Sequence, residues 1–189
     1  MLNFSAENIY SEHMAKLVSW QRYYTRFWKQ SMLFCNNRWP DFLNVYSPDG
    51  LGATGVAEPR YVKAVTGKDL TFEDGIHVGR KIWNLDHAIW TLQGRHRDMV
   101  AFADYLYTQP GTTWDGSPEY MPGIRDGKWD YVITSGRHFD KNKFEDFKTR
   151  FYRFQGWDSN TGWPTRPALE SMGLKAVANE LEKHERLGT

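Results

Sequence analysis

The chain has 189 residues and a formal net charge of +1, from 24 Lys and Arg against 23 Asp and Glu. This length suits one domain, or one and a half, and is sufficient to bury a sizeable core. The nearly balanced charge gives no general electrostatic reason to expect nucleic acid or an anionic membrane surface as a partner.

The single cysteine, Cys35, excludes an internal disulfide and fits a reducing compartment. No secretory signal opens the chain and no run approaches 18 apolar residues, so we expect a cytoplasmic protein without a membrane span. The chain also contains 9 Trp, 10 Tyr and 11 Phe. This aromatic content predicts wide contacts between helices, or a surface covered by another domain.

Helical periodicity dominates the first half of the chain. Apolar residues recur at helical spacing from Ser5 to about Ser31, which predicts one long amphipathic helix. A short helix is expected to begin at Pro59 and end at Gly67. Thr71 to Asp74 form a candidate capping box for a second long helix that stops at Gly94, and a further helix is expected from Met99 to Pro110.

The second half of the chain mixes loops with shorter helices. Residues 111–137 are rich in Gly, Pro, Asp and Trp, which predicts a long surface loop with residues 131–133 extended. Asp140 is expected to cap a helix closed by Gly156, and two short helices follow at 165–172 and 174–185. The predicted fold is all-α, an irregular multi-helix domain with long loops. We divide it into a long helix with its cysteine loop at 1–40 and a helical domain at 41–189.

Two sequence features carry possible chemistry. Cys35 could be a soft metal ligand, a nucleophile or an inert core residue. The six histidines carry no local signature of a catalytic base or a zinc site: His13, His77, His87, His96, His138 and His184. The Arg95-His96-Arg97 cluster suits either an anion or carboxylate site or a solvated helix start.

A long stretch near the carboxyl end resembles a known family. Residues 151–166, from Phe151 to Arg166, and then 169–174 resemble the closing signature of the tungsten-dependent aldehyde ferredoxin oxidoreductase family. Residues 65–71, 79–85 and 94–98 are similar, in order and spacing, to the helical third domain of that family. The resemblance covers most of residues 30–180 and implies the fold of this carboxyl-terminal domain.

The resemblance also implies a role for the cysteine. In the family, the loop that ends in the fourth cluster cysteine has the form Asp-x-x-Gly-Leu-Cys, and residues 30–35 occupy its position, with Gln30 in place of Asp and Leu33 in place of Gly. Cys35 then resembles the fourth thiolate of a 4Fe-4S cluster. The neighbouring residues Ser31, Phe34 and Asn36 are implied to contact the pterin cofactor.

The implied function is that of one part of a larger enzyme. The chain resembles the carboxyl-terminal part of a tungsten bis-molybdopterin and iron–sulfur oxidoreductase that acts on aldehydes with ferredoxin, or an iron–sulfur electron-transfer subunit, as electron acceptor. It would close the cofactor cavity and supply one cluster ligand. The family's pterin domain, three further cysteines and its catalytic histidine and glutamate would lie before residue 1, in the amino-terminal part of the same enzyme or in a separate subunit.

Two alternatives remain open. One is a tungsten-dependent aromatic acyl-CoA reductase, which shares the fold. The other is a helical interaction module that has lost the cofactors and binds a partner protein through its aromatic face. Because one thiolate cannot hold a four-iron cluster, the isolated chain is expected to be inactive.

Overall fold

The computed structural model describes residues 3–33, 57–113 and 115–189. Its helical elements are the 3-10 turns η1 (Asn8–Tyr10) and η3 (Arg97–Met99), the π-helical segment η2 (Thr25–Ser31), and the helices α1 (Glu12–Tyr24), α2 (Ala57–Thr66), α3 (Phe72–Leu92), α4 (Tyr105–Thr108), α5 (Lys141–Gln155), α6 (Arg166–Glu170) and α7 (Lys175–Lys183). Two strands, β1 (Tyr120–Arg125) and β2 (Lys128–Ile133), complete the fold. None of the helices in the described ranges combines the length and apolar character needed to cross a membrane.

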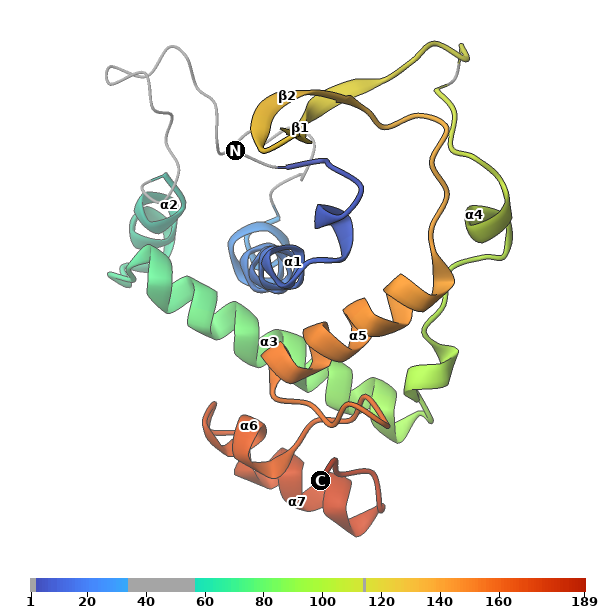
Figure 1. The fold of residues 1–189 in the computed structure, drawn as a ribbon. Helices are drawn as coiled ribbons and strands as arrows, with labels where there is room; N and C mark the ends of the chain where they lie inside the picture. The colour runs from blue at the N-terminus through green and yellow to red at the C-terminus, as the bar shows by residue number, and fades with distance from the viewer. Residues whose placement is uncertain (1–2, 34–56, 114) are drawn as a thin grey trace.

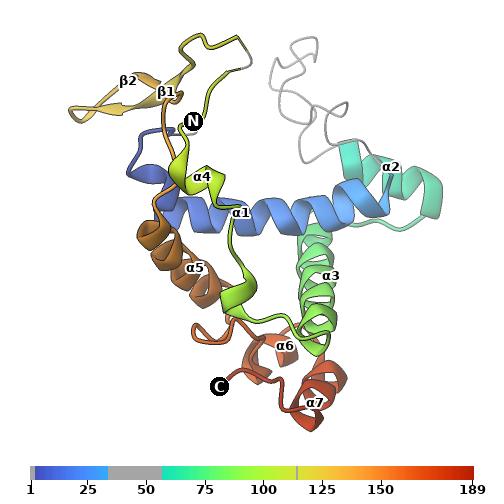
Figure 2. The same cartoon turned by 90° about the vertical axis from the view of Figure 1, so that its right-hand side faces the viewer.

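The first long helix crosses the second. α1 and η2 form one continuous rod that lies across α3, while α5 packs beside α1 (Figure 2). The hairpin β1–β2 lies near the amino-terminal part of α1, and α6 and α7 lie at the far end of α3 (Figure 1). α3 therefore connects the cysteine-proximal half of the molecule with its carboxyl-terminal segment.

Two glycines on one face of α3 allow this crossing. A Cβ atom at Gly79 would lie 1.8 Å from the backbone carbonyl oxygen of Tyr23, and one at Gly75 would lie 2.0 Å from the Trp28 ring. Both distances are far below van der Waals contact, so no other residue fits without moving the rod. The pair was not singled out from the sequence, although two glycines four residues apart lie on the same face of a helix.

The core is built around this crossing from aromatic side chains. Trp28 is fully buried, stacks on Phe72 with 5.7 Å between ring centroids, and donates its indole N–H to the Phe72 carbonyl at 2.9 Å. A buried polar chain joins α1 to α5, because the Tyr23 hydroxyl donates to Gln155 at 2.8 Å and the Gln155 amide donates to Ser19 at 2.7 Å. Burial raises the pKa of Tyr23.

Most helix boundaries follow the local signals in the sequence. Thr71 and Asp74 form the reciprocal capping box of α3, and Asp140 caps α5. Gly94 and Gly156 adopt positive φ angles of 100° and 74° just beyond the helices that they end. The first helix starts later than predicted, at Glu12, because Ser11 caps it and residues 8–10 form a separate turn.

Two predictions of secondary structure were wrong. Residues 99–110 do not form one continuous helix, because Arg97 is held by the carbonyl groups of Ser159 and Glu145 and the chain leaves it extended at Val100. Only the four-residue helix α4 lies in this range. Residues 120–133 form an antiparallel hairpin, of which only residues 131–133 were expected to be extended, so the domain is mainly helical but not strictly all-α. The turn residues Asp126 and Gly127, with φ of 50° and 74°, are those that a two-residue hairpin turn requires.

The crossing generates the first prediction. Gly79→Ala should lower the free energy of unfolding by about 3 kcal/mol, because the added methyl group meets backbone that cannot rotate away. Replacing a glycine inside a helix by alanine normally raises the free energy of unfolding by about 1 kcal/mol. A decrease at Gly79 would therefore differ in sign from the change expected if α3 had free space there. Urea unfolding followed by circular dichroism measures the effect.

Gly111→Ala is the matched control, since its Cβ atom would meet only ordinary contact at 3.5 Å from Arg137. It should change stability little. A Gly79→Ala protein as stable as this control would contradict the close crossing.

Candidate functional site

The residues expected to bind the cofactors lie at the carboxyl end of the rod. Phe34, Cys35 and Asn36 are outside the described residues, as is the domain boundary predicted at residue 40. Ser31 is the last residue of η2, and its hydroxyl donates to the Arg26 carbonyl at 2.9 Å. The structure describes Ser31 as the residue that ends the helix, and its contact with the pterin stays a prediction.

The end of the rod is fixed by buried side chains. Trp28 and Lys29 have only 0% and 2% of their surface exposed. The ammonium of Lys29 lies 5.5 Å from the Tyr24 ring centroid, and the Tyr24 hydroxyl donates to the fully buried Glu58 of α2 at 2.8 Å. These contacts set the position of the last turn, from which Cys35 follows four residues after Ser31.

The described residues do not form a metal site by themselves. In residues 3–33, 57–113 and 115–189, no three His, Cys, Asp or Glu side chains converge in a way that could hold a metal ion. His77 lies beside Glu73 on the exposed face of α3, whereas His87, ten residues further along, is buried. The two histidines therefore do not form a pair in the described structure.

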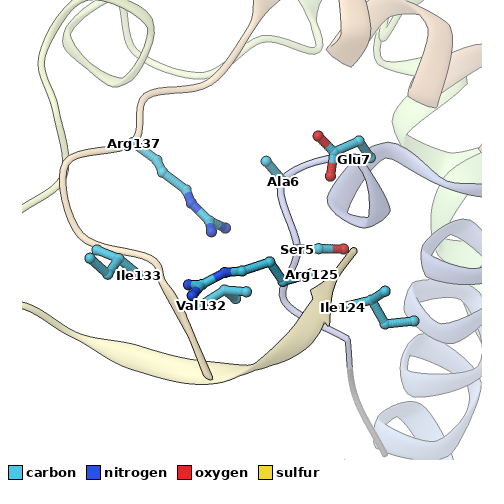
Figure 3. A pocket seen from close by; sticks show the side chains of 8 residues that line it. All are labelled: Ser5, Ala6, Glu7, Ile124, Arg125, Val132, Ile133 and Arg137. Atoms are coloured by element: carbon cyan, nitrogen blue, oxygen red, sulfur yellow. The ribbon is translucent and has the colours of Figure 1, made fainter. Parts of the chain in front are cut away.

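A hollow of about 300 Å³ separates the amino-terminal segment from the hairpin. Figure 3 shows the side chains of Arg125 and Arg137 beside the backbone of residues 5–7. Both guanidinium groups are engaged, because Arg125 pairs with Asp130 at 3.1 Å and Arg137 donates to the Phe4 carbonyl at 2.6 Å. The bond from Arg137 to Phe4 links the segment after the hairpin to the amino-terminal segment beside this hollow.

A second cluster, at the far end of α3, is centred on His87. The imidazole stacks on Trp157 with 3.6 Å between ring centroids, and its Nε2 lies 2.7 Å from the Gly162 carbonyl oxygen. A carbonyl oxygen can only accept, so Nε2 carries the proton. Burial, with the hydrogen bond to Gly162 opposing it and the charge of Arg95 adding to it, lowers the pKa of His87 to about 4.

The loop that follows α5 is held against this cluster. Trp157 donates its indole N–H to the buried Asn84 of α3 at 2.8 Å. Asp158 accepts from the backbone N–H and hydroxyl of Thr161, both at 2.7 Å, and Trp163 donates to the Arg95 carbonyl at 2.9 Å. Residues 157–163 thus form a compact loop that is hydrogen-bonded to α3 and to the segment that follows α3.

A comparison with protein-family models decides the relationship. The model for aldehyde ferredoxin oxidoreductase, domains 2 & 3, matches residues 4–174 of this chain. The chain belongs to the aldehyde ferredoxin oxidoreductase family. Its membership confirms the resemblance found in the sequence and places the chain in the context of an oxidoreductase.

The family signature has a structural explanation in this chain. The signature residues Trp157, Gly162 and Trp163 attach the loop to α3 and to the segment after it, and Asp158 closes the loop by accepting from Thr161. Gly162 has φ of 75°, and a Cβ atom there would lie 3.2 Å from the Tyr152 ring. Sequence reasoning used this stretch for recognition and missed its partner His87, whose burial depends on residues 70 or more positions away.

The buried imidazole predicts a pH dependence. In the unfolded chain a histidine titrates near pH 6.5, so between pH 6.5 and 4 the unfolded state binds a proton that the folded state excludes. The contribution of His87 to stability is complete above pH 6.5 and declines by about 3 kcal/mol on acidification toward pH 4. His87→Gln should remove this part of the pH dependence, measured by urea unfolding at a series of pH values.

His77→Gln is the control, because His77 is mostly exposed. It should retain the wild-type slope. If the free energy of unfolding of His87→Gln changed with pH in parallel with that of the wild type, the neutral buried imidazole would be contradicted.

Proposed function

We propose that this chain is the carboxyl-terminal part of a tungsten-dependent oxidoreductase that oxidises aldehydes and passes electrons to ferredoxin or to an iron–sulfur subunit. In this proposal the chain closes the cofactor cavity and Cys35 provides one thiolate to a 4Fe-4S cluster. The observation that carries it is the family match over residues 4–174. The buried end of the rod supports it, because it gives the segment leading to Cys35 a fixed starting point.

This chain can supply one thiolate ligand to a 4Fe-4S cluster, but it cannot supply all four. A four-iron cluster takes four thiolates, whereas the sequence contains one cysteine. The described part of the chain also brings together no other set of metal-ligating side chains. Three thiolates and the pterin-binding residues would therefore come from another segment or subunit, and we propose that partner as the main binding partner of this chain.

When bound, the tungsten centre would supply the two-electron chemistry at the substrate, and the cluster would transfer electrons one at a time. The contribution of this chain is positional. Trp28, Lys29 and Tyr24 fix the helix end, and Ser31 completes its last turn, so the thiolate would be presented from a rigid support. Rigid support of this kind is what a metal ligand requires from the residues behind it.

One observation favours a second function, that of a cofactor-free interaction module. The cross-strand pairs Tyr120–Ile133, Pro122–Tyr131 and Ile124–Trp129 place apolar side chains on one face of the hairpin. Five of the six are substantially exposed, from 41% for Ile124 to 66% for Tyr131. An exposed aromatic face of this kind suits a protein partner, and the iron content of the native complex separates this function from the enzyme.

The test is the substitution Cys35→Ser in the complex of this chain with its cofactor-bearing partner. A serine hydroxyl is normally protonated and is a poor iron ligand compared with a thiolate. The variant complex should lose the four-iron signal, or convert it to a three-iron signal, in electron paramagnetic resonance, while the helical circular dichroism of the chain persists. Iron analysis should show the corresponding loss.

Gln21→Ala, at an exposed position of α1, controls for nonspecific loss of iron during purification. It should keep the full cluster signal. A Cys35→Ser complex with wild-type iron, spectrum and activity would exclude Cys35 as a ligand, and a native complex without iron would favour the interaction module.

A further inference from the structure

One face of the β1–β2 hairpin is apolar and exposed. Alternation along the two paired strands puts six uncharged side chains on this side, which we call the hairpin face. They are Tyr120, Pro122, Ile124, Trp129, Tyr131 and Ile133. Figure 3 shows the alternation on β2, where the side chains of Val132 and Ile133 leave the strand on opposite sides. All of the six except Pro122 are 41–66% exposed.

The opposite face of the hairpin is attached to the rest of the molecule. Val132 is 7% exposed, and a Cβ atom at Gly123 would lie 3.1 Å from the backbone nitrogen of Ser5. The amino-terminal segment therefore packs closely against this side. The hairpin is held in position by one face, while the hairpin face remains exposed to solvent.

The two edges of the hairpin are occupied near their middle. On the outer edge of β1, the Pro122 carbonyl accepts from the Phe4 N–H at 2.9 Å. On the outer edge of β2, the Tyr131 carbonyl accepts from Arg125 at 3.0 Å, and the Tyr131 N–H donates to Asp130 at 2.8 Å. A strand of another chain would need these backbone groups to extend the sheet. A partner would therefore contact the hairpin face and not an edge.

The hairpin face carries no charged side chain. Strand alternation puts Arg125, Lys128 and Asp130 on the opposite side, and Arg125 and Asp130 pair with each other at 3.1 Å. Complementary charge patterns are what direct an interface toward one particular different protein. The hairpin face has no such pattern, and an identical face would match it without placing like charges together.

The exposed area is sufficient for a weak dimer. An aromatic side chain buries about 150–250 Å², so three half-exposed rings and two half-exposed isoleucines leave roughly 500 Å² available on one chain. Two such faces would bury about 1,000 Å² in total, which is the lower limit for a specific interface.

We propose that the hairpin face binds the same face of a second copy of this chain, in a dimer with two-fold symmetry. In such a contact each patch meets itself, so the central pair Pro122–Tyr131 of one chain lies against that of the other. The aromatic rings of the two faces then pack against one another. The dimer goes beyond both functions proposed above, because it requires neither a cofactor nor a different protein.

Sedimentation equilibrium of the 189-residue chain tests the association. An interface near the lower size limit predicts a dissociation constant on the order of 10–100 µM, so the concentration series should extend about tenfold to either side of this range. Added salt should not weaken the dimer, because no ion pair contributes to it. A chain that stays monomeric throughout, or that assembles beyond a dimer, would overturn the proposal.

Variants test the face itself. Tyr131→Lys brings two like charges together at the centre of the interface and should raise the dissociation constant at least about tenfold. Ile89→Lys is the matched control, because Ile89 is 47% exposed on α3 and the same charge is added there. It should leave the dimer unchanged.

A mixture of Tyr131→Lys with Tyr131→Glu should associate more strongly than either variant alone, because opposite charges then meet at the centre. Circular dichroism establishes that each variant is folded. Wild-type association of folded Tyr131→Lys, loss of the dimer in Ile89→Lys, or no gain in the mixture would each contradict the two-fold contact.

Discussion

The fold depends on the contact between the rod of α1 and η2 and two glycines of α3. At Gly79 there is no room for a side chain between α3 and the Tyr23 carbonyl, and at Gly75 the space is filled by Trp28. The close approach lets the large rings of Trp28 and Phe72 stack beside the crossing and exclude water. Burial of such rings is the main source of stability in a core of this kind.

This crossing gives the two ends of α3 different roles. Near its amino terminus, α3 supports the end of the rod through the hydrogen bond from Trp28 to Phe72, and with it the segment that leads to Cys35. Toward its carboxyl terminus, Asn84 and His87 hold the loop that contains the family signature. The residues that identify the family thus belong largely to the framework, and the proposed metal ligand belongs to a segment attached to it.

Local signals in the sequence were sufficient for most helices but not for the site. The capping box at Thr71 and the stop at Gly156 depend on neighbouring residues and were predicted correctly. The Asp126-Gly127 turn was an equally local signal that was overlooked. The absence of a helix after Met99 and the burial of His87 could not be predicted, because Arg97 and His87 bind carbonyl groups 48–75 residues away. The role of Cys35 rests on family resemblance, since the residue lies outside the described structure.

Native-state hydrogen exchange of the 189-residue chain tests the central role of the crossing most directly. If the rod and α3 form one cooperative unit, the amides of Trp20–Trp28 and of Gly79–His87 should exchange only through the same global opening, with equal free energies. The amides of the hairpin should exchange through smaller openings. Rapid local exchange in the rod, while α3 remains fully protected, would contradict the account.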